Sequence, residues 1–186
     1  AVEVGLAMGA RVIATARGAD RLDVPRRLGA EVVDTAGADV RAGVLELTAG
    51  RGVDVCFDPV GGELGETSLR CLDWEGRYLA IGFAAGAPPT IKANHLLVKN
   101  ISVVGFYWGG YRRRDPERLR ASLATLIGWY AAGRLHPHVS RRLPLDGAGA
   151  ALADLAARRA TGKIVLDVAG TGDQRERVLV GRPGFR

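Results

Sequence analysis

The sequence predicts an α/β fold in which a doubly wound parallel sheet carries helices on both of its faces. The first observation is a series of short apolar runs that have the length and the branched residues of buried strands. The second is that helical stretches of about ten residues, several of them closed by glycine, separate these runs. Short buried strands that alternate with helices form parallel sheets, and their crossovers are right-handed.

Each expected element follows from the local pattern of apolar and turn-forming residues. The expected strands cover residues 11–15, 31–34, 53–57, 76–82 and 101–106. The expected helices cover residues 19–28, 39–48, 64–72 and 115–132. The last helix begins with Asp115 as its N-cap and Pro116 in its first turn, and Gly133 ends it.

The first residues raise a question about the start of the sheet. Residues 1–8 have the pattern of the back half of a helix, which Gly9 ends directly before the strand at 11–15. In the usual doubly wound order the first strand is central, and the glycine-rich loop that follows it binds phosphate at a helix N-terminus. We therefore expect a Rossmann-type sheet that lacks its first strand and glycine loop, in a chain cut within the first helix.

Composition excludes several classes of protein. The 186 residues suit one domain, or one domain with an appendage, and no apolar run approaches the ~20 residues of a membrane span. The net charge of +6 comes almost entirely from arginines scattered among acids, which favours a solvated basic face over a nucleic-acid site. Two cysteines are too few for a disulfide scaffold or a zinc cluster, so a cytoplasmic location is expected.

One stretch near the end of the chain imitates a dinucleotide fingerprint. Residues 147–152 read GAGAAL, and Asp167 lies about 20 residues further on. The third glycine is replaced by Leu152, and the preceding strand-like stretch carries Arg141 and Arg142, which do not suit a buried central strand. We therefore interpret Asp146 as the N-cap of an ordinary helix.

Several stretches, taken together and in order, resemble one protein family. They are GARVIATARGADRL, LGAEVVD, GRGVDVCFDPVGG, GRYLAIGFA, LLVKNISVVGFYWG, AAGRLHPHVSRRLPLDGAGAALADL and RRATGKIVLDV. The set is similar to the zinc-independent quinone oxidoreductase branch of the medium-chain dehydrogenase/reductase superfamily, from Ala1 to about Val168.

The resemblance implies a division of the chain into three parts. Residues 1–133 correspond to a truncated dinucleotide-binding domain. Residues 134–168 correspond to a C-terminal strand–helix–strand that returns to complete an absent catalytic domain. Residues 169–186 extend beyond the family's usual end and are expected to form a disordered tail.

The end of the strand at 11–15 bears on the choice of cofactor. A site that prefers NAD usually has an acid here, whereas Ala14–Arg17 contains none. An arginine can bind the 2′-phosphate of NADPH bidentately, and Arg17 and Arg21 can face one pocket. NADPH is the predicted cofactor. The alternative is that both arginines are solvated residues at the start of a helix.

Further cofactor residues are implied by the resemblance. In that branch, residues near Thr35 and an arginine of the RATGK stretch reach the same phosphate, and Arg159 occupies the latter position. Thr35 stands where tyrosine or histidine is commoner, and the loop is one residue shorter.

The ends of the later strands supply the other candidates. Asp58 and the PVGG that follows it come after a buried strand, where ligands bind open α/β sheets, so Val60 and Gly61 are expected to contact the cofactor. The alternative is an ordinary turn in which Asp58 accepts hydrogen bonds from nearby amides. In the family, two further strand ends flank the nicotinamide ring, and the corresponding residues here are Gly82, Phe83, Ala84, Phe106, Tyr107 and Trp108. The alternative for the aromatic residues is a core edge or a subunit contact.

The function implied is hydride transfer from NADPH to a quinone or an activated enone, with this chain as the cofactor-binding portion of the enzyme and inactive alone. No residue is assigned a catalytic role, and no metal ligand is expected. A homodimer through the strand from Ile101 to Phe106 is expected, with no nucleic acid or membrane partner. Two alternatives stay open. One is a zinc-type alcohol dehydrogenase of the same superfamily, and the other is a truncated, non-catalytic nucleotide-binding module.

Overall fold

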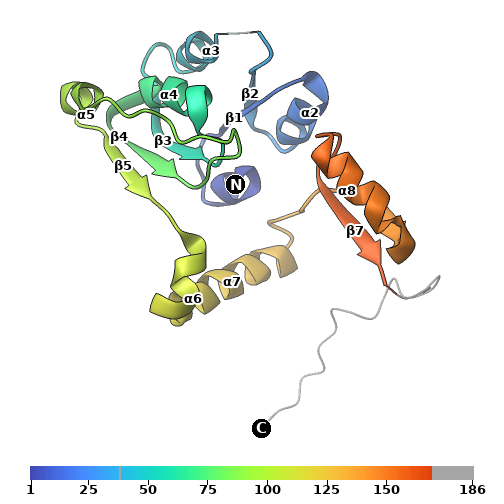
Figure 1. Cartoon of the computed structure of the whole chain (residues 1–186). Helices are drawn as coiled ribbons and strands as arrows, with labels where there is room; N and C mark the ends of the chain where they lie inside the picture. Colours follow the sequence, from blue (N-terminus) through green and yellow to red (C-terminus); the bar gives the residue numbers. More distant parts are fainter. Residues whose placement is uncertain (38, 169–186) are drawn as a thin grey trace. The chain divides into compact units, whose positions relative to one another are not determined.

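The computed structural model describes residues 1–37 and 39–168, and the tail expected at 169–186 lies outside this range. The chain divides into two compact units, one from Ala1 to His136 and one that begins at Pro137. Both units combine helices with parallel strands (Figure 1). The predicted α/β class is confirmed.

The first unit follows the predicted alternation of strands and helices. Its elements are α1 (Val2–Ala7), β1 (Ile13–Ala16), α2 (Ala19–Arg27), β2 (Glu31–Asp34), α3 (Val40–Leu47), β3 (Val53–Asp58), α4 (Gly62–Arg70), β4 (Leu72–Ala80), α5 (Ala93–Lys99), β5 (Ser102–Gly105), a 3-10 turn (Trp108–Gly110), α6 (Tyr111–Arg114) and α7 (Pro116–Ala131).

The strands of this unit form two parallel sheets. One sheet pairs β1 with β2, and the other has the order β3-β4-β5. Within the part of the chain that the structure describes, β1 and β3 do not pair with one another. This separation agrees with a doubly wound sheet that lacks its first strand, because that strand would stand between them.

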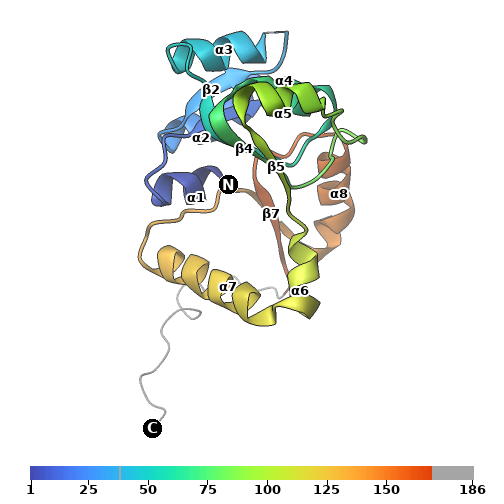
Figure 2. The same cartoon turned by 90° about the vertical axis from the view of Figure 1, so that its left-hand side faces the viewer.

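Helices α3, α4 and α5 cover one face of these strands, and α1 lies on the other face (Figure 2). Below α3, Val33 of β2 packs with Val40, Val44 and Cys71. Asp39 fixes the start of α3 by accepting a hydrogen bond from the Ala42 amide at 3.1 Å. The spacing of Val40 and Val44 turns one side of the helix toward the sheet.

A second cluster lies below β4 and β5. It joins Leu69 of α4, Leu72 and Tyr78 of β4, and Ile101. Leu72 is fully buried and Tyr78 is 1% exposed. Through Tyr78, whose hydroxyl donates to Asp58, this cluster reaches the end of β3.

The boundaries of two predicted elements were wrong. The helix expected at 64–72 is α4, which ends at Arg70, and the strand expected to begin at residue 76 begins at Leu72. The acidic residues Asp73 and Glu75 hid the start of β4 from the sequence pattern, but the Leu72 side chain is buried and its carbonyl accepts a hydrogen bond from Lys99 Nζ at 2.6 Å. Helix α5 was missed as an element.

The second unit is the expected strand–helix–strand. It contains β6 (Val139–Pro144), a 3-10 turn (Leu145–Gly147), α8 (Ala148–Ala156) and β7 (Lys163–Asp167), with β6 and β7 parallel. The interpretation of Asp146 as the N-cap of α8 was wrong. The 3-10 turn includes Asp146, so Gly147 takes the N-cap position, and no side chain caps the helix.

Candidate functional site

The candidate site is the edge of the first unit at which the parallel strands end. Turns that follow β1, β2, β3, β4 and β5 all begin at carboxyl ends of strands, which is where open α/β sheets bind ligands. Eleven of the twelve residues predicted to contact a cofactor belong to these turns and the helix starts beside them. The twelfth, Arg159, belongs to the second unit.

The turns after β1 and β2 bring Arg17 and Thr35 to neighbouring positions. The Thr35 amide donates to the Ala16 carbonyl at 2.9 Å, so Thr35 extends the pairing of the two strands to the residue before Arg17. The Arg17 side chain is exposed. Arg21 follows in the first turn of α2, whose N-cap is Gly18.

Sequence reasoning missed Asp34, which ends β2. Its Oδ1 accepts hydrogen bonds from the Gly18 amide at 3.0 Å and the Ala36 amide at 2.8 Å. These two bonds, with a smaller contribution from the charge of Arg17, lower the pKa of Asp34 below its usual value. An acidic side chain is therefore present at the carboxyl ends of β1 and β2. It is Asp34 of β2, whereas Ala14–Arg17 of β1 contains no acid. The signal available in the sequence was an aspartate at the end of a predicted strand.

The turns after β3 and β4 are joined into a double loop. In it, the Ala84 amide donates to the Pro59 carbonyl at 3.1 Å, and the Ala85 amide donates to the Val60 carbonyl at 2.9 Å. A further bond of 2.9 Å links the Gly62 amide to the Ala87 carbonyl. The loop thus brings together the predicted residues Val60, Gly61, Gly82, Phe83 and Ala84.

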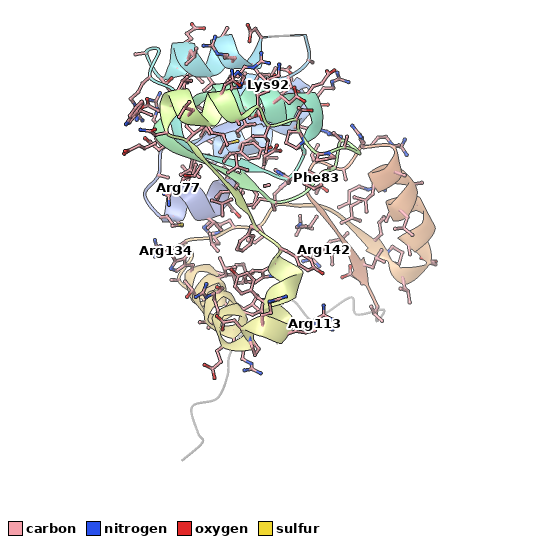
Figure 3. The ribbon with its side chains drawn as sticks, turned by 60° about the vertical axis from the view of Figure 1, so that its left-hand side comes forward. Arg77, Phe83, Lys92, Arg113, Arg134 and Arg142 are labelled. Carbon is pink, nitrogen blue, oxygen red and sulfur yellow. The ribbon has the colours of Figure 1, made fainter. Side chains whose placement is uncertain are left out.

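Close packing explains the glycine at position 61. Gly61 has φ of +70°, and a Cβ built on it would lie 2.8 Å from the Ala87 carbonyl oxygen and 2.9 Å from Cδ1 of Phe83. Any larger residue would push the two halves of the double loop apart. Phe83 itself is 49% exposed and stands at the loop end of β4 (Figure 3).

Asp58 anchors the double loop from below. Its carboxylate accepts hydrogen bonds from the Val60 amide at 2.7 Å and the Gly61 amide at 3.0 Å, and it is 5% exposed. The Tyr78 hydroxyl donates to the same carboxylate. The bonding to local amides that we gave as the alternative role of Asp58 is therefore present.

An aromatic cluster follows β5. The Phe106 amide donates to the Ala80 carbonyl at 3.0 Å, which holds the ends of β4 and β5 side by side. The Phe106 ring stacks on Trp108 with centroids 5.9 Å apart, and Tyr111 contacts both rings. Tyr111 was missed by the sequence analysis. Tyr107 does not join this cluster, because its ring lies against Gly109 and Gly110 and is largely exposed.

In the second unit, the guanidinium of Arg159 forms an ion pair with Asp154. Its Nε and Nη2 donate to Asp154 Oδ1 at 2.9 and 2.7 Å. Arg141 donates to the other oxygen of the same carboxylate. An anionic ligand at Arg159 would have to compete with Asp154.

The described residues offer little for metal or thiol chemistry. No group of three or more His, Cys, Asp or Glu side chains in that part of the chain is arranged to hold a metal ion. Burial, with the charge of Asp58 as the second cause, raises the pKa of Cys56 to about 12, and burial also raises the pKa of Cys71. None of the described helices combines the length and the apolar character that crossing a membrane requires.

The chain is similar to known oxidoreductases. A family profile described as "Zinc-binding dehydrogenase" matches residues 28–166. A quinone oxidoreductase-like protein 2 homolog from Nematostella vectensis is 37% identical over 161 residues, which are 86% of this chain and 44% of that protein. The chain therefore spans less than half the length of this relative.

Two solved structures carry the same fold. A mycobacterial protein solved in complex with NADPH has a TM-score of 0.77 and 27% identity over 89% of this chain and 52% of its own. A 2-haloacrylate reductase has a TM-score of 0.76 and 30% identity over 90% of this chain and 53% of its own.

Proposed function

Because the chain belongs to the zinc-binding dehydrogenase family and to its quinone oxidoreductase-like branch, we propose that it is the cofactor-binding portion of an NADPH-dependent oxidoreductase. The substrate class is a quinone or an activated enone. The double loop carries this proposal, because it gathers Val60, Gly61, Gly82, Phe83 and Ala84 at the carboxyl ends of two parallel strands.

The chemistry of the groups at this edge fits a nicotinamide nucleotide. The exposed guanidinium of Arg17 suits a 2′-phosphate, Arg21 follows it in the first turn of α2, and the Thr35 amide bonds to the residue before it. The exposed ring of Phe83 and the cluster of Phe106 and Trp108 suit the flat face of a nicotinamide or an aromatic substrate. When bound, NADPH supplies a hydride to the acceptor.

The residues of the chain contribute placement rather than acid–base chemistry. The double loop fixes the backbone of Val60 and Gly61, and the aromatic residues offer an exposed apolar surface to a flat ring. We assign no catalytic residue among the 186. The absence of a zinc requirement and the inactivity of these residues alone are parts of the proposal.

Arg17 provides the sharpest test of the cofactor. In the full-length protein, Arg17→Asp should raise the KM for NADPH at least about tenfold, since a charged hydrogen bond contributes about 1.5–3 kcal/mol. The KM for NADH should change little. Arg27→Asp is the matched control, because Arg27 is also an exposed arginine but lies at the far end of α2 from Arg17. Equal use of NADH and NADPH by the wild type would refute the role of Arg17.

The description of the family favours a second candidate, a zinc-type alcohol dehydrogenase. The described residues bring no zinc donors together, so no step through zinc is derived. Zinc content measured by mass spectrometry, with NADP⁺ reduction by primary alcohols, separates the two. A zinc-containing protein that oxidises alcohols and leaves quinones and enones untouched would replace the first proposal.

The proposal includes a homodimer in the cytoplasm. Strand β5 is the edge of its sheet, Val104 is exposed in it and Phe106 is exposed directly after it, so a second copy can pair there. The two free cysteines suit a reducing compartment. A monomeric mass for the full-length protein in solution would contradict the dimer.

A further inference from the structure

A carboxylate and a phenol are buried together below the double loop. Asp58 is 5% exposed and Tyr78 is 1% exposed. In the parallel pairing, Tyr78 stands opposite Cys56, so Asp58, two residues further along β3, points to the same side of the sheet. Its Oδ2 accepts a hydrogen bond from the Tyr78 hydroxyl. Burying a carboxylate costs free energy unless several hydrogen-bond donors compensate for the lost water.

The remaining donors come from the turn itself. The Val60 amide reaches Asp58 Oδ1 at 2.7 Å, and the Gly61 amide reaches Oδ1 at 3.0 Å and Oδ2 at 3.2 Å. One carboxylate therefore connects a side chain of β4 with two backbone amides of the turn. If the carboxylate rotates, the turn must move with it.

Helix α4 leaves room for this arrangement at one residue. A Cβ on Gly65 would lie 2.7 Å from Asp58 Oδ2 and 2.7 Å from the Tyr78 hydroxyl. Burial, followed by the hydrogen bond to Asp58, raises the pKa of Tyr78, so the phenol stays protonated and remains a donor throughout the physiological range. The pair is thus held on three sides by β3, β4 and α4.

We propose that Asp58 and Tyr78 are positioning residues that preset the Val60–Gly61 backbone for the nicotinamide nucleotide, although neither needs to touch it. This inference rests on the proposed function, because it presumes that the double loop contacts the cofactor. It adds Tyr78, which the sequence analysis did not name, and links the turn contacts of Asp58 to the cofactor. The hydroxyl of Tyr78 acts through Asp58, and Asp58 acts through the two amides.

The central experiment is Tyr78→Phe in the full-length protein, which keeps the ring and removes the donor. We expect the KM values for NADPH and NADH to rise together, each about tenfold, as for the loss of one hydrogen bond to a charged group. The value of kcat should stay within about twofold, because no reacting group is removed. An equal rise distinguishes this pair from Arg17, which should affect NADPH alone.

A second measurement does not depend on the nucleotide. Hydrogen exchange of the peptide that contains residues 59–63 should become faster in Tyr78→Phe and fastest in Asp58→Ala. Asp58→Asn should recover most of the protection, because its amide oxygen can still accept from Val60 and Gly61. Leu69→Val is the matched control: Leu69 is 4% exposed in the same cluster and makes no polar side-chain contact. It should lower Tm and leave both KM values and the exchange of residues 59–63 unchanged.

Three results would overturn the inference. If Tyr78→Phe lowers Tm but leaves both KM values unchanged, Tyr78 is a packing residue. If Asp58→Asn exchanges as fast as Asp58→Ala, the two amides are not held by this acceptor. If the wild type binds neither nucleotide while exchange responds as expected, the pair orders the turn but the proposed function is wrong.

Discussion

The turns after β1 and β3 share one hydrogen-bond arrangement but differ in how deeply it is buried. In each, a glycine with positive φ takes the N-cap position of the next helix, and an aspartate accepts the hydrogen bond of its amide. Gly18 is held by Asp34 from the neighbouring strand, and Gly61 is held by Asp58 from its own strand. Asp34 is half-buried, whereas Asp58 is buried and shared with Tyr78.

The difference indicates which part of the site is rigid. Nothing lies within 4 Å of a Cβ on Gly18, while the corresponding position on Gly61 is filled by Ala87 and Phe83. A hydrogen bond in low dielectric is stronger and its loss is more costly than one near water. We infer that the turn after β3 keeps one conformation. The turn after β1 can adjust to the 2′-phosphate end of the nucleotide, which differs between NADPH and NADH.

The largest expected effect comes from opening a cavity in the cluster that packs Tyr78. Leu72→Ala should lower the free energy of unfolding by about 2–5 kcal/mol, because it leaves a cavity in the cluster that holds Tyr78. Denaturant unfolding of the full-length protein measures this. Leu97→Ala is the control, since Leu97 is 77% exposed on α5 and should change stability by less than about 0.5 kcal/mol. Similar losses in both variants would show that β4 does not depend on this cluster.

A matched pair of glycine substitutions separates backbone strain from packing. Gly18→Ala and Gly61→Ala both impose positive φ on alanine, which costs about 1–3 kcal/mol at each site. Only Gly61→Ala also drives a methyl group into the Ala87 carbonyl, so it should destabilise by about 1–3 kcal/mol more. Thermal or denaturant unfolding gives the difference. Equal destabilisation would remove the contrast between the two turns.

The smallest effect is a pH dependence at the adjustable turn. The pKa of Asp34 is lowered from 3.8 in the folded chain, so its stabilising contribution is present above that pH and is lost as the pH falls through the folded pKa. Asp34→Asn lacks this titration. Unfolding midpoints measured between pH 6 and pH 2.5, a range chosen to bracket the usual value, should therefore converge as the solution becomes acidic. If the difference between the wild-type and Asp34→Asn midpoints stays constant over this pH range, the pH-dependent stabilisation does not come from Asp34.

The sequence predicts the alternation of strands and helices well, because apolar runs and terminal glycines are local signals. It also predicts which turns gather at the site, since the carboxyl ends of parallel strands meet at one edge. It does not reveal Asp34, Tyr78 or Tyr111, whose roles depend on partners 16, 20 and 5 residues away that only the fold brings close. The start of β4 was not predicted for a related reason. Asp73 breaks the apolar pattern of the strand, and its partner is the distant Arg51, whose Nη1 lies 2.9 Å from Asp73 Oδ2.

The burial of Cys56 and Cys71 has a chemical consequence for the proposed substrates. Quinones and activated enones are electrophiles that alkylate thiolates, and only the thiolate form of cysteine reacts appreciably. Burial raises the pKa of Cys56 to about 12, so the thiol form prevails near pH 7. Cys71, the other cysteine of the chain, is 4% exposed. Neither cysteine of this chain therefore offers a readily formed thiolate to an electrophile of the proposed substrate class.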